Sequence, residues 1–141
     1  MKTKLVRPIV MILGLALLLS ACGEVKPAGL TDDQVMQVTA GLLTAIDQNE
    51  YAAFQADLSD EMAALFTEEQ FNQLHDLLQT NSGSYVSMDA PELSNSSGYA
   101  VYRIRCQYEL EDVMVTVTFL IDGTQVEGLF FDSPNLRTAA Q

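Results

Sequence analysis

The stretch that decides the fold runs from Gly98 to Phe131 and reads GYAVYRIRCQYELEDVMVTVTFLIDGTQVEGLFF. β-branched and aromatic residues dominate it and alternate along much of its length with polar ones, which is typical of strands that bury one face. Asp122-Gly123 is a two-residue hairpin signal between two such runs. The stretch therefore predicts a three-strand antiparallel meander with one strongly apolar face.

The alternation also predicts how the strands pair. We place the turns at Glu111-Asp112 and Asp122-Gly123, because this register gathers the large apolar residues on one face, and a slip of one residue would scatter them. The pairs expected in the first hairpin are Tyr102–Ile121, Ile104–Phe119, Cys106–Val117 and Tyr108–Val115. The pairs expected in the second hairpin are Phe119–Val126, Val117–Gly128 and Val115–Phe130.

Four helices are expected before the meander. Residues 32–48 carry apolar side chains at helical spacing and follow a capping box made by Thr31 and Gln34. The other predicted helices are a short one through Leu58 capped by Asn49, one over residues 60–66 capped by Ser59, and one from a Thr67–Gln70 capping box to about Gln79.

The segments around the meander are expected to be simpler. Residues 85–89 predict a short edge strand, residues 91–97 a polar loop, and residues 132–141 a tail that contributes little. Helices followed by an antiparallel sheet indicate the α+β class. We expect N-terminal helices packed on a curved four-strand antiparallel sheet, with the domain over residues 31–132 and a C-terminal tail over 133–141.

The order of these elements resembles a known family. The segments LLTAIDQNEYAAF (42–54), LSDEM (58–62) and LFTEEQF (65–71), followed by a glycine loop and the meander, are similar to bacterial domain-of-unknown-function family 3887. The resemblance covers residues 32–132 and implies a cystatin-like or nuclear-transport-factor-like cone, in which a curved sheet wraps around helices and can leave a cavity. Isomerases, dehydratases, binding modules and accessory domains share that cone, so the fold does not choose a function. The Tyr and Asp pattern of its steroid isomerase relatives has no match here.

The first 21 residues are expected to be a lipoprotein signal peptide. Lys2, Lys4 and Arg7 precede an apolar run over residues 9–19 that is too short to span a membrane. The run ends in Leu19-Ser20-Ala21-Cys22, which resembles the lipobox of bacterial lipoproteins. The resemblance implies that Cys22 carries the lipid, palmitate included, and that the protein is extracytoplasmic on the bacterial cell membrane. The short segment over residues 22–30 is expected to be the lipidated cysteine and its tether. The alternative is an ordinary secretory peptide with a chance cysteine.

The charge limits the partners. The chain has 19 acidic and seven basic residues and a formal charge of −12. Cleavage before Cys22 would remove three basic residues and no acidic one, which takes the charge to −15. Nucleic-acid phosphates need a basic surface, so nucleic acid is not an expected partner. Attraction to anionic lipid is not expected either, so membrane attachment would depend on the acyl anchor.

His75 is the candidate catalytic residue. It is the single histidine of the chain and lies on the apolar face of its predicted helix, one turn after Phe71. It could be a general acid or base at the mouth of a cavity. The alternative is a boundary residue whose ring packs while one nitrogen reaches water or a backbone carbonyl.

The predicted register also suggests a ligand pocket. Cys106, Val117 and Gly128 would form a row of small residues, hence a dent in the sheet, lined by Tyr102, Tyr108 and His75. The alternatives are that a helix side chain fills the dent, or that Gly128 marks a bulge that bends the sheet. Cys106 itself is expected to be an inert buried thiol.

The other face of the sheet carries two further candidates. Arg103 and Arg105 could hold an anionic ligand, although an ion pair across the sheet with Glu127 explains them as well. Met114, Leu120, Leu129 and Phe131 are predicted to make that face half apolar, which is typical of an interface. A second copy of the chain or an envelope protein is the expected partner there.

The sequence lacks the patterns of metal, phosphate or dinucleotide sites, so no metal or cofactor is expected. We expect a lipid-anchored accessory or binding domain that engages a protein partner or a small apolar ligand. The alternatives are a small isomerase-like or hydrolase-like enzyme that uses His75 with Tyr102 or Tyr108, and a purely structural spacer.

Overall fold

The computed structural model describes residues 23–141, so the predicted signal peptide and Cys22 lie outside the described residues. The helices are α1 (Asp32–Asp47), α2 (Tyr51–Gln55), α3 (Asp60–Leu65), α4 (Glu68–Asn81) and α5 (Pro134–Ala139). The strands are β1 (Tyr85–Met88), β2 (Glu92–Ser96), β3 (Tyr99–Tyr108), β4 (Asp112–Leu120) and β5 (Val126–Asp132). The α+β class is confirmed.

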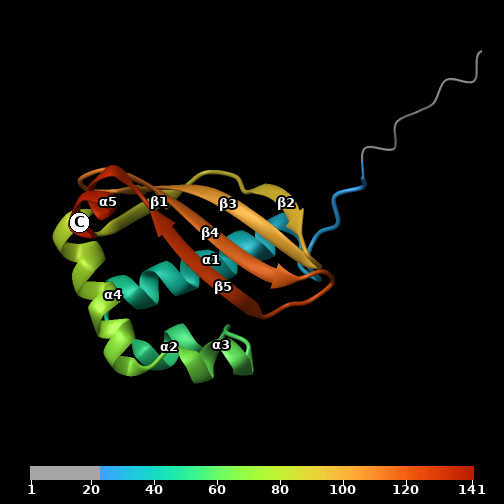
Figure 1. Ribbon diagram of the computed structural model, residues 1–141, viewed down its shortest axis with the longest axis horizontal. Coiled ribbons are helices and arrows are strands. Elements are labelled where there is room, and N and C mark those ends of the chain that lie inside the picture. The colour runs from blue at the N-terminus through green and yellow to red at the C-terminus, as the bar shows by residue number, and fades with distance from the viewer. Residues whose placement is uncertain (1–22) are drawn as a thin grey trace, which may run out of the picture.

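One antiparallel sheet carries the domain. Its order is β1-β3-β4-β5, and β2 pairs with the same edge of β3 as β1 does, further along the strand. Figure 1 shows α1, α2 and α3 on one side of this sheet, and α4 and α5 at the end where the chain finishes. The strands alternate between buried and exposed residues along β3 and β4, so one face of the sheet meets the helices and the other meets solvent.

The helices begin where their caps predict. Thr31 and Thr67 each accept a hydrogen bond from the backbone N–H three residues on, and the glutamine at that position bonds back to the threonine N–H. Ser59 caps α3 in the same way through the N–H of Met62. Asn49 does not cap α2 as predicted: it has φ of 57° after the end of α1, and Glu50 takes the cap position without a side-chain bond.

The first hairpin pairs in a different register from the predicted one. Tyr102 lies opposite Val117 and Ile104 lies opposite Val115, with Glu109-Leu110 as the turn. Distant backbone fixes this turn, because the N–H of Leu110 donates to Ser82 O at 3.0 Å and that of Glu109 donates to Ser84 O at 3.1 Å. The shift is by an even number of residues, so the same side chains still face the core.

The second hairpin begins in the predicted register and then departs from it. Phe119 lies opposite Val126 as predicted, but an irregularity follows, and Val117 and Val115 lie opposite Leu129 and Phe131. The cause is the chain before α3: Val126 O accepts from the Ser59 N–H, and Val126 N–H donates to Asp57 O, both at 2.9 Å. The resulting bulge reverses the facing of the rest of β5.

Two segments form a strand and a helix where a loop and a tail were predicted. The predicted polar loop over residues 91–97 forms β2, because Ser97 and Gly98 both have positive φ and make a tight hairpin into β3. The predicted tail forms α5, which Ser133 caps at its N-terminus and which buries Leu136. The sheet therefore has five strands instead of the four expected.

Candidate functional site

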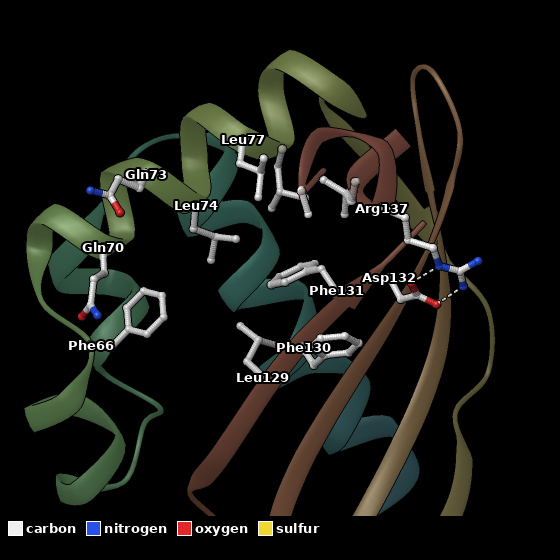
Figure 2. A pocket seen from close by; sticks show the side chains of 13 residues that line it. Phe66, Gln70, Gln73, Leu74, Leu77, Leu129, Phe130, Phe131, Asp132 and Arg137 are labelled. Atoms are coloured by element: carbon white, nitrogen blue, oxygen red, sulfur yellow. Dashed lines mark hydrogen bonds and ion pairs between the residues drawn. The ribbon is translucent and has the colours of Figure 1, made fainter. Parts of the chain in front are cut away.

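An apolar groove of about 520 Å³ lies between α4, β5 and α5. Figure 2 shows Leu74 and Leu77 descending from α4 toward Leu129 and Phe131 on β5. We call this feature the α4–β5 groove. Its lining is mostly leucine and phenylalanine, and its residues are Phe66, Gln70, Gln73, Leu74, Leu77, Leu78, Leu129, Phe130, Phe131, Asp132, Leu136, Arg137 and Ala140.

Helix α4 supplies one wall because its apolar stripe is wider than the core needs. Phe71 and Leu78 are buried in the core, while Leu74 is only partly buried and Leu77 is 41% exposed. Leu74 and Leu77 lie beside the buried stripe at helical spacing, so they border the groove. An exposed leucine at this position is available to contact a ligand.

Strand β5 supplies the other wall as a consequence of its bulge. The bulge turns Leu129 and Phe131 toward the helices, where they pack against the edge of the core. Phe130 lies between them in sequence and is 63% exposed. Since β5 is the last strand of the sheet order, its outer edge borders the groove without a further strand.

The rim of the groove carries a few polar groups. Arg137 and Asp132 form a bidentate ion pair, with Arg137 Nε 2.6 Å from Asp132 Oδ1 and Nη2 bonded to Oδ2. The hydrogen bond from Arg137 lowers the pKa of the Asp132 carboxyl, and the same bond raises that of Arg137. Gln70 and Gln73 lie on the opposite rim (Figure 2). The ion pair is neutral as a unit, so the groove has no net charge of its own.

Helix α5 is held at the end of the groove by Glu111. One carboxylate oxygen of Glu111 accepts from Ser82 Oγ at 2.7 Å and Ser133 Oγ at 2.6 Å, and the other accepts from Asn135 N at 3.2 Å. Burial opposes the charge, but these bonds outweigh it and hold the pKa of the Glu111 carboxyl below its ordinary value. This carboxylate ties the β3–β4 turn to the end of α4 and the start of α5.

His75 does not line the groove. Its Nδ1 lies 2.6 Å from Ile46 O, near the C-terminal end of α1. A carbonyl oxygen can only accept, so Nδ1 carries the proton in this contact. The ring is partly buried and joins α4 to α1, which is the boundary role that the sequence left open beside the catalytic one.

The predicted dent in the sheet does not form. Gly128 lies opposite Thr118, on the face away from the helices, because of the bulge in β5. The structure therefore agrees with the alternative expectation that Gly128 marks a bulge. Tyr102 and Cys106 have no exposed surface, and neither they nor Tyr108 line the groove.

The three buried residues have structural contacts instead. The hydroxyl of Tyr102 accepts a bond of 3.0 Å from Ala28 N, and its ring packs edge-on against Phe119. Burial, with a smaller contribution from Asp89, raises the pKa of the Cys106 thiol to about 12. Burial likewise raises the pKa of Tyr108. A thiol of this kind is a poor nucleophile.

Two of the four interface residues predicted on the outer face of the sheet do not lie on that face. Met114 and Leu120 are on that face, and Leu120 is 47% exposed. Leu129 and Phe131 were predicted there but face the helices, and Phe130 takes the outward position. An interface through Met114 and Leu120 stays a prediction.

Glu127, the predicted ion-pair partner of Arg103 and Arg105, bonds to a different residue. Glu127 accepts a bond of 3.0 Å from the Ser59 hydroxyl, because the bulge holds it next to the start of α3. Arg103 and Arg105 border a shallow hollow on the outer face with Asp89, Glu92 and Met114. Within residues 23–141, the ion pair that forms is Arg137–Asp132.

Two properties of residues 23–141 bear on the class of site. No group of three or more His, Cys, Asp or Glu residues among residues 23–141 is placed to hold a metal ion. In the same part of the chain, no helix is long and apolar enough to cross a membrane. The groove itself is lined mostly by apolar side chains and has a polar rim.

The fold and the groove define a small α+β domain of the curved-sheet class, with its hollow between the last strand and the helices. Residues 40–129 match the family described as "Protein of unknown function (DUF3887)", and the chain belongs to this family. The chain is also similar to the NMR structure of a protein from Ruminococcus gnavus ATCC 29149, with a TM-score of 0.54 and 12% identity. That similarity covers 77% of this chain and 99% of the other, and it supports the fold alone. No curated protein matches the chain.

The groove was not predicted from the sequence. Part of its α4 wall was, since a helix with an apolar face was expected from Thr67 to about Gln79. The β5 wall was not, because its facing depends on the bulge at Glu127-Gly128. The Ser133-Pro134 pair is a helix-start signal that would have found α5.

Proposed function

We propose that this chain is a lipid-anchored, extracytoplasmic binding domain that takes a small molecule with an apolar body in the α4–β5 groove. The observation that carries the proposal is the groove itself. Its volume of about 520 Å³ falls in the range of roughly 300–1,000 Å³ that is usual for small-molecule sites. Mostly apolar walls and a few convergent polar groups are the usual composition of such a site.

The charges of the groove lining and of the whole chain favour an uncharged or cationic ligand. The lining contains one acid and one base, and these neutralise each other. The chain as a whole carries −12, and such a field lowers the local concentration of anions and raises that of cations. A free fatty acid or another anionic amphiphile is therefore a poorer fit than a neutral ligand of the same shape.

The groove supports a binding domain better than an enzyme. Its polar groups are two glutamines and an ion pair whose members are occupied with each other. His75, the candidate acid or base, is bonded to Ile46 O outside the groove. A general acid–base mechanism needs such a group within hydrogen-bond reach of the reacting atom.

A binding titration tests the groove directly. Residues 23–141 are titrated with an uncharged environment-sensitive fluorophore, and with an anionic fluorophore of similar size. We expect saturable binding of the uncharged probe and at least several-fold weaker binding of the anionic one. Leu77→Gln and Phe130→Ser, both at exposed groove positions, should weaken the binding of the uncharged probe.

A matched control separates the groove from general surface hydrophobicity. Leu65 is 75% exposed on α3 and does not line the groove. Leu65→Gln should leave the affinity unchanged. Equal loss in Leu65→Gln and Leu77→Gln, or no saturable binding at all, would remove the support for a groove ligand.

The lipid anchor is tested by mass. Full-length protein is recovered from a bacterial envelope, and native mass spectrometry measures the mature chain. We expect loss of residues 1–21 and an added mass of acyl chains on Cys22, both absent in Cys22→Ala. A further reproducible mass of a few hundred daltons on the chain of native sequence, beyond the mass of the acyl chains, would identify a natural occupant of the groove. A mature chain that begins elsewhere would refute the anchor without bearing on the groove.

A further inference from the structure

The segment between Cys22 and α1 is bound to the domain instead of being a free tether. The backbone of Lys26 forms two hydrogen bonds with the Asn95 side chain: Lys26 N donates to Oδ1 at 2.6 Å, and Lys26 O accepts from Nδ2 at 2.7 Å. Gly29 N donates to Gly123 O at 2.7 Å. The segment over residues 26–29, which we call the N-terminal strap, thus joins the β2–β3 hairpin to the β4–β5 loop.

The strap is packed as well as hydrogen-bonded. Ala28 is 4% exposed, and its N–H donates to the hydroxyl of the fully buried Tyr102. A Cβ on Gly29 would lie 2.6 Å from Asp122 O, so the approach of the strap to the loop needs glycine here. Together these contacts fix the strap to one end of the sheet.

The docked strap leaves little free chain before it. Gly23, Glu24 and Val25 separate Cys22 from Lys26, and four Cα–Cα steps span at most roughly 14 Å. A lipid on Cys22 would hold the first docked residue within that distance of the acyl attachment point. A tether of nine flexible residues, as expected from sequence, would allow far more freedom of orientation.

We infer that the end of the domain formed by the N-terminal strap, the β2–β3 turn (96–99) and the β4–β5 loop (121–125) faces the bilayer, and that the α4–β5 groove lies toward the opposite end. Figure 1 shows the strap and both of these turns at one end of the sheet, and α4 and α5 at the other. Strand β5 starts at the loop with Val126 and reaches the groove at Leu129, a distance of roughly 10 Å. This inference rests on the proposed anchor at Cys22.

The orientation restricts where a groove ligand comes from. A groove beside the bilayer could take its ligand from the lipid phase of the same membrane. A groove toward the far end receives a ligand from the aqueous side or from another envelope component. The expected ligand is therefore one that dissolves in water as a monomer or is delivered by a partner protein.

Fluorescence energy transfer measures the orientation. The chain has no tryptophan, so one introduced tryptophan is a unique donor. Thr124→Trp marks the loop end and Asn72→Trp marks α4, and both positions are exposed. The chain from Cys22 to Gln141 is coupled through Cys22 to a maleimide lipid in vesicles that contain a dansyl-headgroup lipid as acceptor. Cys106 is fully buried and does not compete for the maleimide.

We expect transfer from Thr124→Trp to be at least two-fold more efficient than from Asn72→Trp. The double variant Asn95→Ala/Gly29→Ala releases the strap, and it should reduce this difference. Equal transfer from both positions in the native background, or stronger transfer from Asn72→Trp, would overturn the inference. Because the coupling is chemical, this result is independent of whether cells acylate Cys22, which the mass measurement decides.

Discussion

The Ser133 hydroxyl donates a hydrogen bond of 2.6 Å to the carboxylate of Glu111, 22 residues earlier in the chain. The same carboxylate oxygen accepts from Ser82 at the end of α4. Glu111 therefore connects the β3–β4 turn to the end of α4 and the start of α5, and these two helices border the α4–β5 groove. Helix α5, with six residues, is too short to be stable alone, so its position depends on contacts of this kind.

Replacing Glu111 with glutamine should destabilise the domain. Three donors converge on the two carboxylate oxygens, and the glutamine NH₂ would have to face at least one of them. We expect a loss of about 1–3 kcal/mol in the free energy of unfolding, measured by urea denaturation. Asp112→Asn is the matched control, since Asp112 is adjacent and exposed, and it should change stability by less than about 0.5 kcal/mol.

The contribution of Glu111 should also depend on pH. Its carboxyl pKa is lowered in the folded state from an ordinary value of 4.5. A lowered folded pKa gives stability that is present above pH 4.5 and is lost as the pH falls through the folded pKa. The gap in unfolding free energy between the native chain and Glu111→Gln should therefore shrink from about pH 6 to about pH 3. A gap that stays constant over this range would contradict the role assigned to the carboxylate.

Cys106 should react with thiol reagents only in the unfolded state. The side chain has no exposed surface, and burial raises the pKa of the thiol to about 12, so thiolate is scarce at pH 8. For residues 23–141, which contain this one cysteine, we expect negligible labelling by a disulfide reagent at pH 8 and one thiol labelled in urea. Rapid labelling of the folded chain would show that β3 opens to solvent.

Local signals in the sequence predicted the four helices that precede the sheet, although not the cap of α2. Thr31 and Thr67 each precede a glutamine by three residues, and a capping box is complete within four residues of chain. The core face of β3 and β4 was also predictable, because the facing of side chains in these two strands follows from alternation alone. The hairpin turn at Ser97-Gly98 was not predicted, because residues 91–97 were interpreted as a polar loop.

The strand register and the groove depend on contacts between distant residues, so local signals in the sequence could not predict them. Ser82 and Ser84 select the Glu109-Leu110 turn from more than 20 residues away. Ser59 and Asp57 pair with Val126 and force the bulge that turns Leu129 and Phe131 inward. A one-residue irregularity in β5 therefore moved the candidate site from the centre of the sheet to its edge.

Replacing His75 should affect stability and leave ligand binding unchanged. The Nδ1–H of His75 donates to Ile46 O at 2.6 Å and joins α4 to α1. His75→Ala removes this bond and part of the packing, so we expect a loss of about 1–2 kcal/mol in the free energy of unfolding. His75→Gln offers an amide donor in its place and should recover part of the loss. The affinity of the α4–β5 groove for the uncharged probe should not change in either variant, because His75 does not line the groove. If His75→Ala abolishes binding while the chain keeps its stability, the histidine belongs to the site and the acid–base alternative regains its support.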